Sequence, residues 1–200
     1  MDTNIKPGTI WGVGRNYIDH ANEMNAPIPT EPLIFLKSGN CLVENSHFIN
    51  IPALTHNLHY EVEIIVQLNV NLEPYRMALA LDLTARDKQE EAKANGTPWS
   101  LAKSFKNSCP VSAWTSFENY DWFSSLEFHL TLNGEIKQAG NTKDMIFSLE
   151  KLLYYLKLNF PVQPGDMILT GTPAGVGQLN RSDFVEVQMT NYIDWQWQID

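Results

Sequence analysis

The chain has 200 residues, of which 44% are hydrophobic and 18% charged, a composition typical of one globular domain (residues 1–200) and not of a disordered chain. Its formal net charge of −9 argues against a nucleic acid or an acidic membrane surface as a partner. The charge does not exclude a small anionic substrate, because one local cation can reverse the field inside a pocket.

Signals for a compartment are few. The two cysteines, Cys41 and Cys109, form no C-x-x-C pair and indicate no disulfide framework, which favours a reducing compartment. The first residues carry no basic region followed by an apolar run, and no segment reaches the ~18 consecutive apolar residues of a membrane-spanning helix. We therefore expect a cytoplasmic protein without a membrane partner.

Short strands separated by Gly, Pro and Asn turns are predicted along the first 83 residues. These strands are residues 9–14, 32–37, 61–68 and 77–83, and a weakly helical stretch, residues 16–27, follows the first of them. The stretch LHYEVEIIV (58–66) alternates as a single strand would. Its core face would hold Tyr60, Val62, Ile64 and Val66, and its other face His59, Glu61, Glu63 and Ile65.

The second half of the chain contains the clearest local signals. Residues 84–96 are predicted as a helix with Thr84 as N-cap and Gly96 as its end. Asn133-Gly134 predicts a type I′ hairpin turn, and Ser148 is expected to cap a short amphipathic helix. A strand in residues 164–173 and closing strands in 183–189 and 192–199 complete the chain. The expected fold class is mainly β with short helices (α+β), since strands and helices do not alternate as a doubly wound parallel sheet requires.

Three carboxylates could form a cation site. Glu61 and Glu63 project from the same face of their predicted strand, which could equally be a solvated face. Asp82 ends the apolar run MALALDL, so its carboxylate begins in or beside the core and needs a partner. It could cap the following helix. If the three carboxylates converge, they would suit a hard cation such as Mg²⁺, Mn²⁺ or Ca²⁺.

Two further motifs have both a catalytic and an ordinary interpretation. His20 and Glu23 are three residues apart, so on a helix they would share a face as a base and the group that orients it. An ordinary surface histidine is the alternative. Lys103 lies between apolar residues, where it could stabilise an oxyanion or simply extend its ammonium to solvent.

Six stretches, in this order, resemble the fumarylacetoacetate hydrolase family, and in particular its short, single-domain acylpyruvate hydrolase branch. They are GRNYIDHANEM (14–24), PLIFLK (32–37), HNLHYEVE (56–63), LDLTARDKQ (81–89), PWSLAKSFKNSCPVS (98–112) and GDMILTGTPAGVG (165–177). The resemblance implies a mixed β roll of the type of that family's C-terminal domain. It also implies a homodimer with a divalent metal in each subunit, Mg²⁺ being expected and Mn²⁺ or Ca²⁺ being alternatives.

The resemblance also implies roles for individual residues. Glu61, Glu63 and Asp82 match the metal ligands, and Lys103 matches the active-site lysine. His20 and Glu23 match a histidine–glutamate pair that lies on a mobile lid in the family. The positions expected to face the substrate are Arg15, Tyr17, Arg86, Gln89 and Thr172.

The function that the resemblance implies is metal-dependent hydrolysis of a C–C bond in a 3-acylpyruvate or related β-diketo acid. His20 would activate water, Lys103 would stabilise the oxyanion, and pyruvate and a carboxylic acid would leave. The same site could instead decarboxylate or tautomerise oxaloacetate, or isomerise an intermediate of aromatic catabolism. A non-catalytic homologue that keeps the fold as a binding module is a further alternative.

One departure from the family concerns the link between two of the expected ligands. Only residues 64–81 separate Glu63 from Asp82, where a longer insertion with a helix and a Gly-Gly segment would be expected. A deletion there could shift the strand that carries Asp82. The metal geometry is therefore the part of the prediction that the structure tests most directly.

Overall fold

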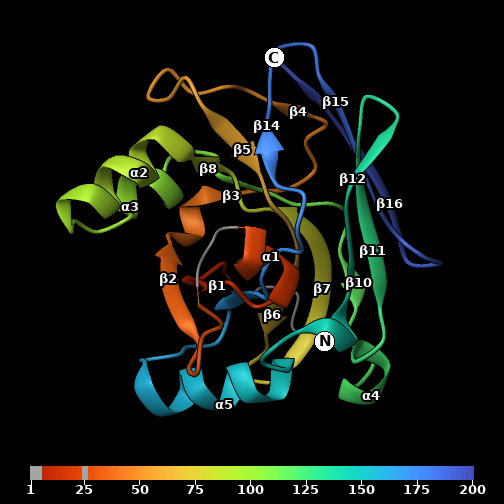
Figure 1. Cartoon of the computed structure of the whole chain (residues 1–200). Coiled ribbons are helices and arrows are strands. Elements are labelled where there is room, and N and C mark those ends of the chain that lie inside the picture. The colour runs from red at the N-terminus through yellow and green to blue at the C-terminus, as the bar shows by residue number, and fades with distance from the viewer. Residues whose placement is uncertain (1–5, 24–26) are drawn as a thin grey trace.

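A mixed six-stranded sheet forms the centre of the computed structural model, which describes residues 6–23 and 27–200 (Figure 1). Strands β1 and β13 pair in parallel, and the other neighbours are antiparallel. In spatial order the strands are β10 (Thr115–Ser116), β7 (Pro74–Leu81), β6 (Val62–Leu68), β13 (Met167–Leu169), β1 (Ile10–Gly14) and β2 (Leu33–Lys37).

A five-stranded sheet packs beside the first one, on the right of the view in Figure 1. Its order is β12 (Glu135–Asn141), β11 (Glu127–Leu132), β15 (Phe184–Met189), β16 (Ile193–Ile199) and β4 (Phe48–Ile49). Two smaller sheets complete the β structure. They are β14 (Gly177–Gln178), β5 (Leu58–Tyr60) and β8 (Thr84–Ala85), and the pair β3 (Leu42–Val43) and β9 (Cys109–Pro110).

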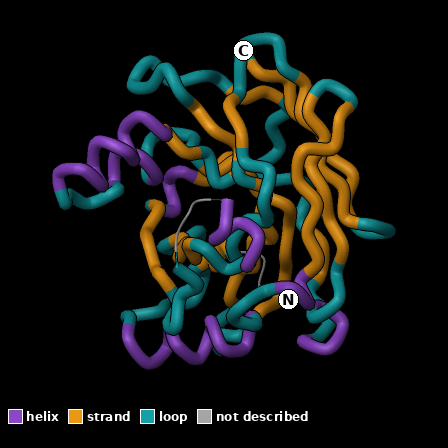
Figure 2. Tube along the Cα trace, viewed as in Figure 1, coloured by secondary structure: helices purple, strands orange, loops and turns teal. Residues whose placement is uncertain are grey.

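Short helices lie around the sheets, as Figure 2 shows by colour. None of the described helices has the length and apolar character needed to cross a bilayer. The α-helices are α1 (Ile18–Glu23), α2 (Arg86–Asn95), α3 (Ser100–Lys103), α4 (Tyr120–Phe123) and α5 (Leu149–Asn159), and two 3₁₀ turns are η1 (Gly39–Cys41) and η2 (Thr142–Asp144). The predicted class, mainly β with short helices, is confirmed.

Strand β6 lies between two hydrophobic clusters, and all seven of its residues are buried. Val62, Ile64 and Val66 belong to the larger cluster, together with residues of the five-stranded sheet, so this face is the predicted core face. Ile65, on the other face, packs in the smaller cluster. Burial on both sides means that polar groups on this strand need partners within the protein.

Two local predictions are confirmed. The hairpin of β11 and β12 turns at Asn133 and Gly134, whose φ angles of 52° and 83° are those of a type I′ turn. Helix α5 begins after Ser148, whose side chain accepts a hydrogen bond from the backbone N–H of Lys151.

Two others need correction. The stretch 58–66 is not one strand: β5 ends at Tyr60 and β6 begins at Val62, and the two belong to different sheets. Thr84 is not an N-cap, because it pairs with His59 in β8 and helix α2 begins two residues later. The helix does end at Gly96, which has the expected left-handed conformation.

The short link between Glu63 and Asp82 is a direct antiparallel hairpin. Strands β6 and β7 pair along their length, with Val62 opposite Leu81 and Glu63 opposite Ala80. The backbone N–H of Asp82 donates to the carbonyl of Glu61 at 2.8 Å. The hairpin register therefore places Asp82 beside Glu61, and the short connection does not separate the expected ligands.

Candidate active site

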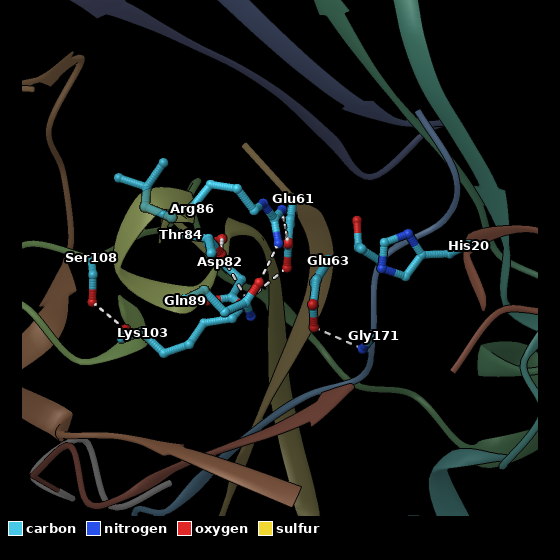
Figure 3. A network of polar contacts seen from close by, with 12 residues as sticks. His20, Glu61, Glu63, Asp82, Thr84, Arg86, Gln89, Lys103, Ser108 and Gly171 are labelled. Carbon is cyan, nitrogen blue, oxygen red and sulfur yellow. Dashed lines mark hydrogen bonds and ion pairs between the residues drawn. The ribbon is translucent and has the colours of Figure 1, made fainter. Parts of the chain in front are cut away.

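Three buried carboxylates converge at the ends of β5, β6 and β7 (Figure 3). Glu61 lies in the break between β5 and β6, Glu63 is the second residue of β6, and Asp82 directly follows β7. One ligand oxygen from each lies within 4.8 Å of those of the other two. The side chains are almost completely excluded from solvent, with residue exposures of 5%, 1% and 0%. The solvated-face alternative for Glu61 and Glu63 is therefore excluded.

Three cations accompany these carboxylates. The Nζ atom of Lys103 lies 2.7 Å from Oε2 of Glu61 and 2.5 Å from Oδ2 of Asp82, and it also donates to the hydroxyl of Thr84. Arg86 donates to Oε1 of Glu61 at 2.5 Å. Lys37, which is completely buried, lies 2.8 Å from Oδ1 of Asp82. Three positive and three negative side chains thus balance within the protein.

The carboxylates differ in their surroundings. Burial alone would raise the pKa of Glu61, but the charges of Lys103 and Arg86 outweigh burial and hold that pKa well below its usual range. Burial, and then the charges of Asp82 and Glu61, raise the pKa of Glu63 well above its ordinary value. Glu63 receives a hydrogen bond from the backbone N–H of Gly171 at 2.7 Å, but no cationic side chain among the described residues contacts it.

The donor set fits a hard divalent cation. All three ligands are carboxylates, which Mg²⁺, Mn²⁺ and Ca²⁺ prefer over softer metals. Within residues 6–23 and 27–200 no donor contacts Oε1 of Glu63, so this buried carboxylate has an oxygen left for a cation. A cation between the three side chains would supply the positive partner that Glu63 otherwise lacks.

The predicted histidine–glutamate pair forms on α1. Nδ1 of His20 lies 3.0 Å from Oε2 of Glu23, and the backbone N–H of Gly175 donates to Oε1 of Glu23 at 3.0 Å. His20 is only 6% exposed. In Figure 3 its ring lies on the other side of Glu63 from Lys103. The pair therefore approaches the carboxylates from the opposite wall.

These residues line one cavity of about 310 Å³. Thr172 and Gln89 belong to its polar wall, and Gln89 accepts a hydrogen bond from Arg86 at 2.6 Å. The remaining wall is apolar, formed by Val13, Leu33, Phe35 and Trp99. The cavity brings together nine of the eleven predicted residues: Arg15, His20, Glu61, Glu63, Arg86, Gln89, Lys103 and Thr172 line it, and Asp82 lies directly behind it.

Glu23 and Tyr17 are the two predicted residues that belong neither to the cavity wall nor to the carboxylate triad. Glu23 contributes through its bond to His20. Tyr17 is packed in the larger hydrophobic cluster with a buried hydroxyl, and it contacts a separate surface hollow beside Met145. The structure gives its expected substrate contact no support.

Three other polar residues were not anticipated. Lys37 follows Leu33 and Phe35 on the cavity face of β2, a position that period-two alternation in PLIFLK could have indicated. Lys93 lines the cavity from α2, seven residues after Arg86. Gln138 on β12 accepts from the N–H of Val62 and donates to Thr172 and Pro173. No local sequence signal marks Gln138, because its partners come from distant segments.

Comparisons with known proteins show the family to which the chain belongs. The chain matches the family model for the C-terminal domain of fumarylacetoacetate hydrolase over residues 9–196. It is 38% identical to a mitochondrial oxaloacetate tautomerase of Bos taurus, over 95% of this chain and 93% of the relative, and 39% identical to that of Homo sapiens with the same coverage. A mitochondrial oxaloacetate decarboxylase of Dictyostelium discoideum is 35% identical over 96% of this chain and 92% of the relative.

Solved structures show the same fold. A fumarylpyruvate hydrolase of Pseudomonas aeruginosa, in complex with Mn²⁺ and pyruvate, superposes with a TM-score of 0.91 at 26% identity, covering 100% of this chain and 92% of that one. A fumarylacetoacetate isomerase/hydrolase-like protein of Oleispira antarctica gives 0.92 at 33% identity, covering 97% and 94%. The resemblance drawn from the six sequence stretches is confirmed, and the chain belongs to the fumarylacetoacetate hydrolase family.

Proposed function

We propose that this chain is a divalent-metal-dependent enzyme that interconverts the keto and enol forms of oxaloacetate. The observation that carries the proposal is the buried triad of Glu61, Glu63 and Asp82 beside a cavity that His20 closes from the other side. Relatives named oxaloacetate tautomerase, at 38–39% identity over 95% of the chain, support the choice of substrate. Mg²⁺ is the proposed cation, and the Mn²⁺ in the Pseudomonas aeruginosa relative supports a divalent ion of this kind.

Conversion of keto to enol oxaloacetate removes one proton from C3 and adds one proton to the oxygen at C2. A bound divalent cation supplies Lewis-acid stabilisation of negative charge on that oxygen. His20 can take and return the proton: when its Nδ1 donates to Glu23, Nε2 is left as the basic atom. Burial lowers the pKa of Lys103, but Asp82 and Glu61 outweigh burial and raise it, so the ammonium stays charged and stabilises an anion instead of accepting a proton.

Hydrolysis of an acylpyruvate is the second candidate. It needs a base that activates water, and the His20–Glu23 pair, buried at the cavity wall, suits that step as well. The resemblance in structure to a fumarylpyruvate hydrolase favours it further. Both reactions place negative charge where the carboxylate triad would hold a cation. They differ in two respects: only hydrolysis needs a water molecule, and the two substrates differ in the part that lies away from the cation.

Direct assays separate the candidates. With Mg²⁺ present, we expect the purified protein to accelerate the decay of enol oxaloacetate, followed by ultraviolet absorbance. Pyruvate release from acetylpyruvate and from fumarylpyruvate tests the second function in the same preparation. Rapid pyruvate release with no effect on the enol would overturn the tautomerase proposal in favour of the hydrolase.

His20→Ala should reduce tautomerisation and acylpyruvate hydrolysis by about 100-fold or more, because a general base contributes about 10²–10⁴-fold. Decarboxylation of oxaloacetate should persist within a few-fold, since it depends mainly on the cation. His56→Ala is the control, because His56 is exposed and pairs with Asp87 outside the cavity. Unchanged tautomerisation in His20→Ala would exclude His20 as the base.

A further inference from the structure

We propose that Arg15 and Lys93 form a subsite for the second carboxylate of a dicarboxylate substrate and so select dianions over monoanions. The inference rests on the proposed function for the reacting end of the cavity. It adds Lys93, assigns Arg15, which the resemblance already expects to face the substrate, to the distal carboxylate, and states what the two residues discriminate. Both line the cavity that contains the carboxylate triad.

Arg15 and Lys93 differ from the other cations of the cavity in lacking an acidic partner. Arg86 and Lys103 are held by Glu61 and Asp82 at 2.5–2.7 Å. Among residues 6–23 and 27–200, no carboxylate lies within ion-pair distance of Arg15 or Lys93. Arg15 is half-buried and Lys93 is exposed to solvent at the cavity, so both cations are free to receive an anionic ligand that enters it, although the chain as a whole has a net charge of −9.

The spacing of residues along helix α2 determines how far Lys93 lies from Arg86, which pairs with Glu61 of the triad. Arg86, Gln89 and Lys93 are spaced i, i+3 and i+7, so they lie along one face of the helix. Seven residues correspond to about 10 Å along the axis, and the lysine side chain points back toward the helix N-terminus. Lys93 thus reaches the cavity from its outer end, with Nζ 5.4 Å from the ring centroid of Trp99.

Arg15 completes the subsite from the opposite segment. It directly follows β1 and has a left-handed φ of 57°, a conformation uncommon for arginine. Burial, and then the charge of Arg86, lower the pKa of Lys93, and Lys103 and Arg15 act in the same direction while Glu61 opposes them. The Lys93 ammonium therefore lies in a field of like charge that an anion would relieve.

The charge balance favours a dianion. The triad is already balanced by Lys37, Lys103 and Arg86, so a divalent cation adds two positive charges to those of Arg15 and Lys93. A dicarboxylate compensates more of this excess than a monocarboxylate of the same length. The apolar wall around Leu33 and Phe35 suits the carbon chain between the two ends.

Binding of a matched, unreactive pair tests the subsite: malate and 2-hydroxybutanoate, which differ by a carboxylate in place of a methyl group. By calorimetry with Mg²⁺-loaded protein, we expect the wild type to prefer malate by about tenfold, as one charge-assisted hydrogen bond would give. Lys93→Met should remove most of this preference, and Arg15→Met should do the same. Lys88→Met is the control, because Lys88 is on the same helix but pairs with Glu91 outside the cavity.

Equal affinity of the wild type for the two ligands, or a preference that survives Lys93→Met, would overturn the proposal. Kinetic measurements test the subsite separately from the proposed tautomerase function. Lys93→Met should raise KM for oxaloacetate with little change in kcat, since the subsite binds ground state and transition state alike. A protein that prefers malate but does not turn over oxaloacetate would contradict the tautomerase function and leave the subsite standing.

Discussion

Replacing Asp82 by Asn should lower the affinity for Mn²⁺ by at least about 100-fold and abolish turnover, because groups that merely orient metal ligands already contribute about 10–100-fold. Asp82 is one of the three converging carboxylates, and the substitution leaves Lys37 and Lys103 without their common acidic partner. Titration of the stripped protein with Mn²⁺, followed by electron paramagnetic resonance of the free ion, measures the affinity independently of activity.

Asp166→Asn is the matched control for that experiment. Asp166 is also a buried aspartate, and it accepts hydrogen bonds from Thr9, Trp11 and Gln163, away from the cavity. We expect Asp166→Asn to lose stability and to keep its Mn²⁺ affinity. Exhaustive treatment of the wild type with EDTA should abolish activity, and Mg²⁺ or Mn²⁺ should restore it. Full turnover by metal-free protein would contradict the proposed role of the triad.

The local parts of the fold could be predicted because their signals are local. Asn133-Gly134 requires positive φ at both positions, which specifies a type I′ turn whatever surrounds it. Ser148 followed by an amphipathic pattern specifies the start of α5 in the same way. Thr84 has an equally good capping signal, but pairing with His59 in a distant strand takes precedence. Pairing with a distant strand cannot be predicted from the few residues around Thr84.

The acidic residues of the candidate site could be predicted from the sequence better than its basic residues. Glu61 and Glu63 are marked by their spacing, and Asp82 by its place at the end of an apolar strand. The break in the strand at Glu61 could not be predicted, since β5 and β6 join different sheets through partners far along the chain. Lys37 and Lys93 were missed because a lysine at a strand end or a helix end is usually solvated.

The three basic residues around the triad, Lys37, Lys103 and Arg86, explain how the protein core tolerates buried carboxylates. Uncompensated buried carboxylates would destabilise the fold, and a cation that binds only the folded protein offsets this cost only while the cation is present. Lys37, Lys103 and Arg86 pair with Glu61 and Asp82 within the protein itself, and the raised pKa of Glu63 favours its neutral form when no metal is bound. We therefore expect the fold to form without the metal, so that metal affinity and folding stability can be measured separately.

Lys37→Met should lower the free energy of unfolding by about 3–5 kcal/mol, the range for breaking a buried ion pair by removing one partner. Lys37 is 0% exposed. Its ammonium lies 2.8 Å from Asp82 and also donates to the carbonyls of Leu83, Lys103 and Ser108. Methionine fills a similar volume but satisfies none of these acceptors. Urea denaturation of the metal-free protein measures the loss, and Lys157→Met, at a partly exposed pair with Glu73, should show no comparable change.

A double-mutant cycle separates the charge effect from a general packing defect. Lys37→Met removes the cation beside Oδ1 of Asp82, whereas adding Asp82→Asn removes the charge that lost this cation and leaves Glu61 paired with Lys103 and Arg86. We therefore expect the double variant to be more stable than Lys37→Met alone, with a coupling energy of about 1–3 kcal/mol. If the two losses simply add, Lys37 acts through packing and its carbonyl contacts, and the pairing with Asp82 does not stabilise the fold.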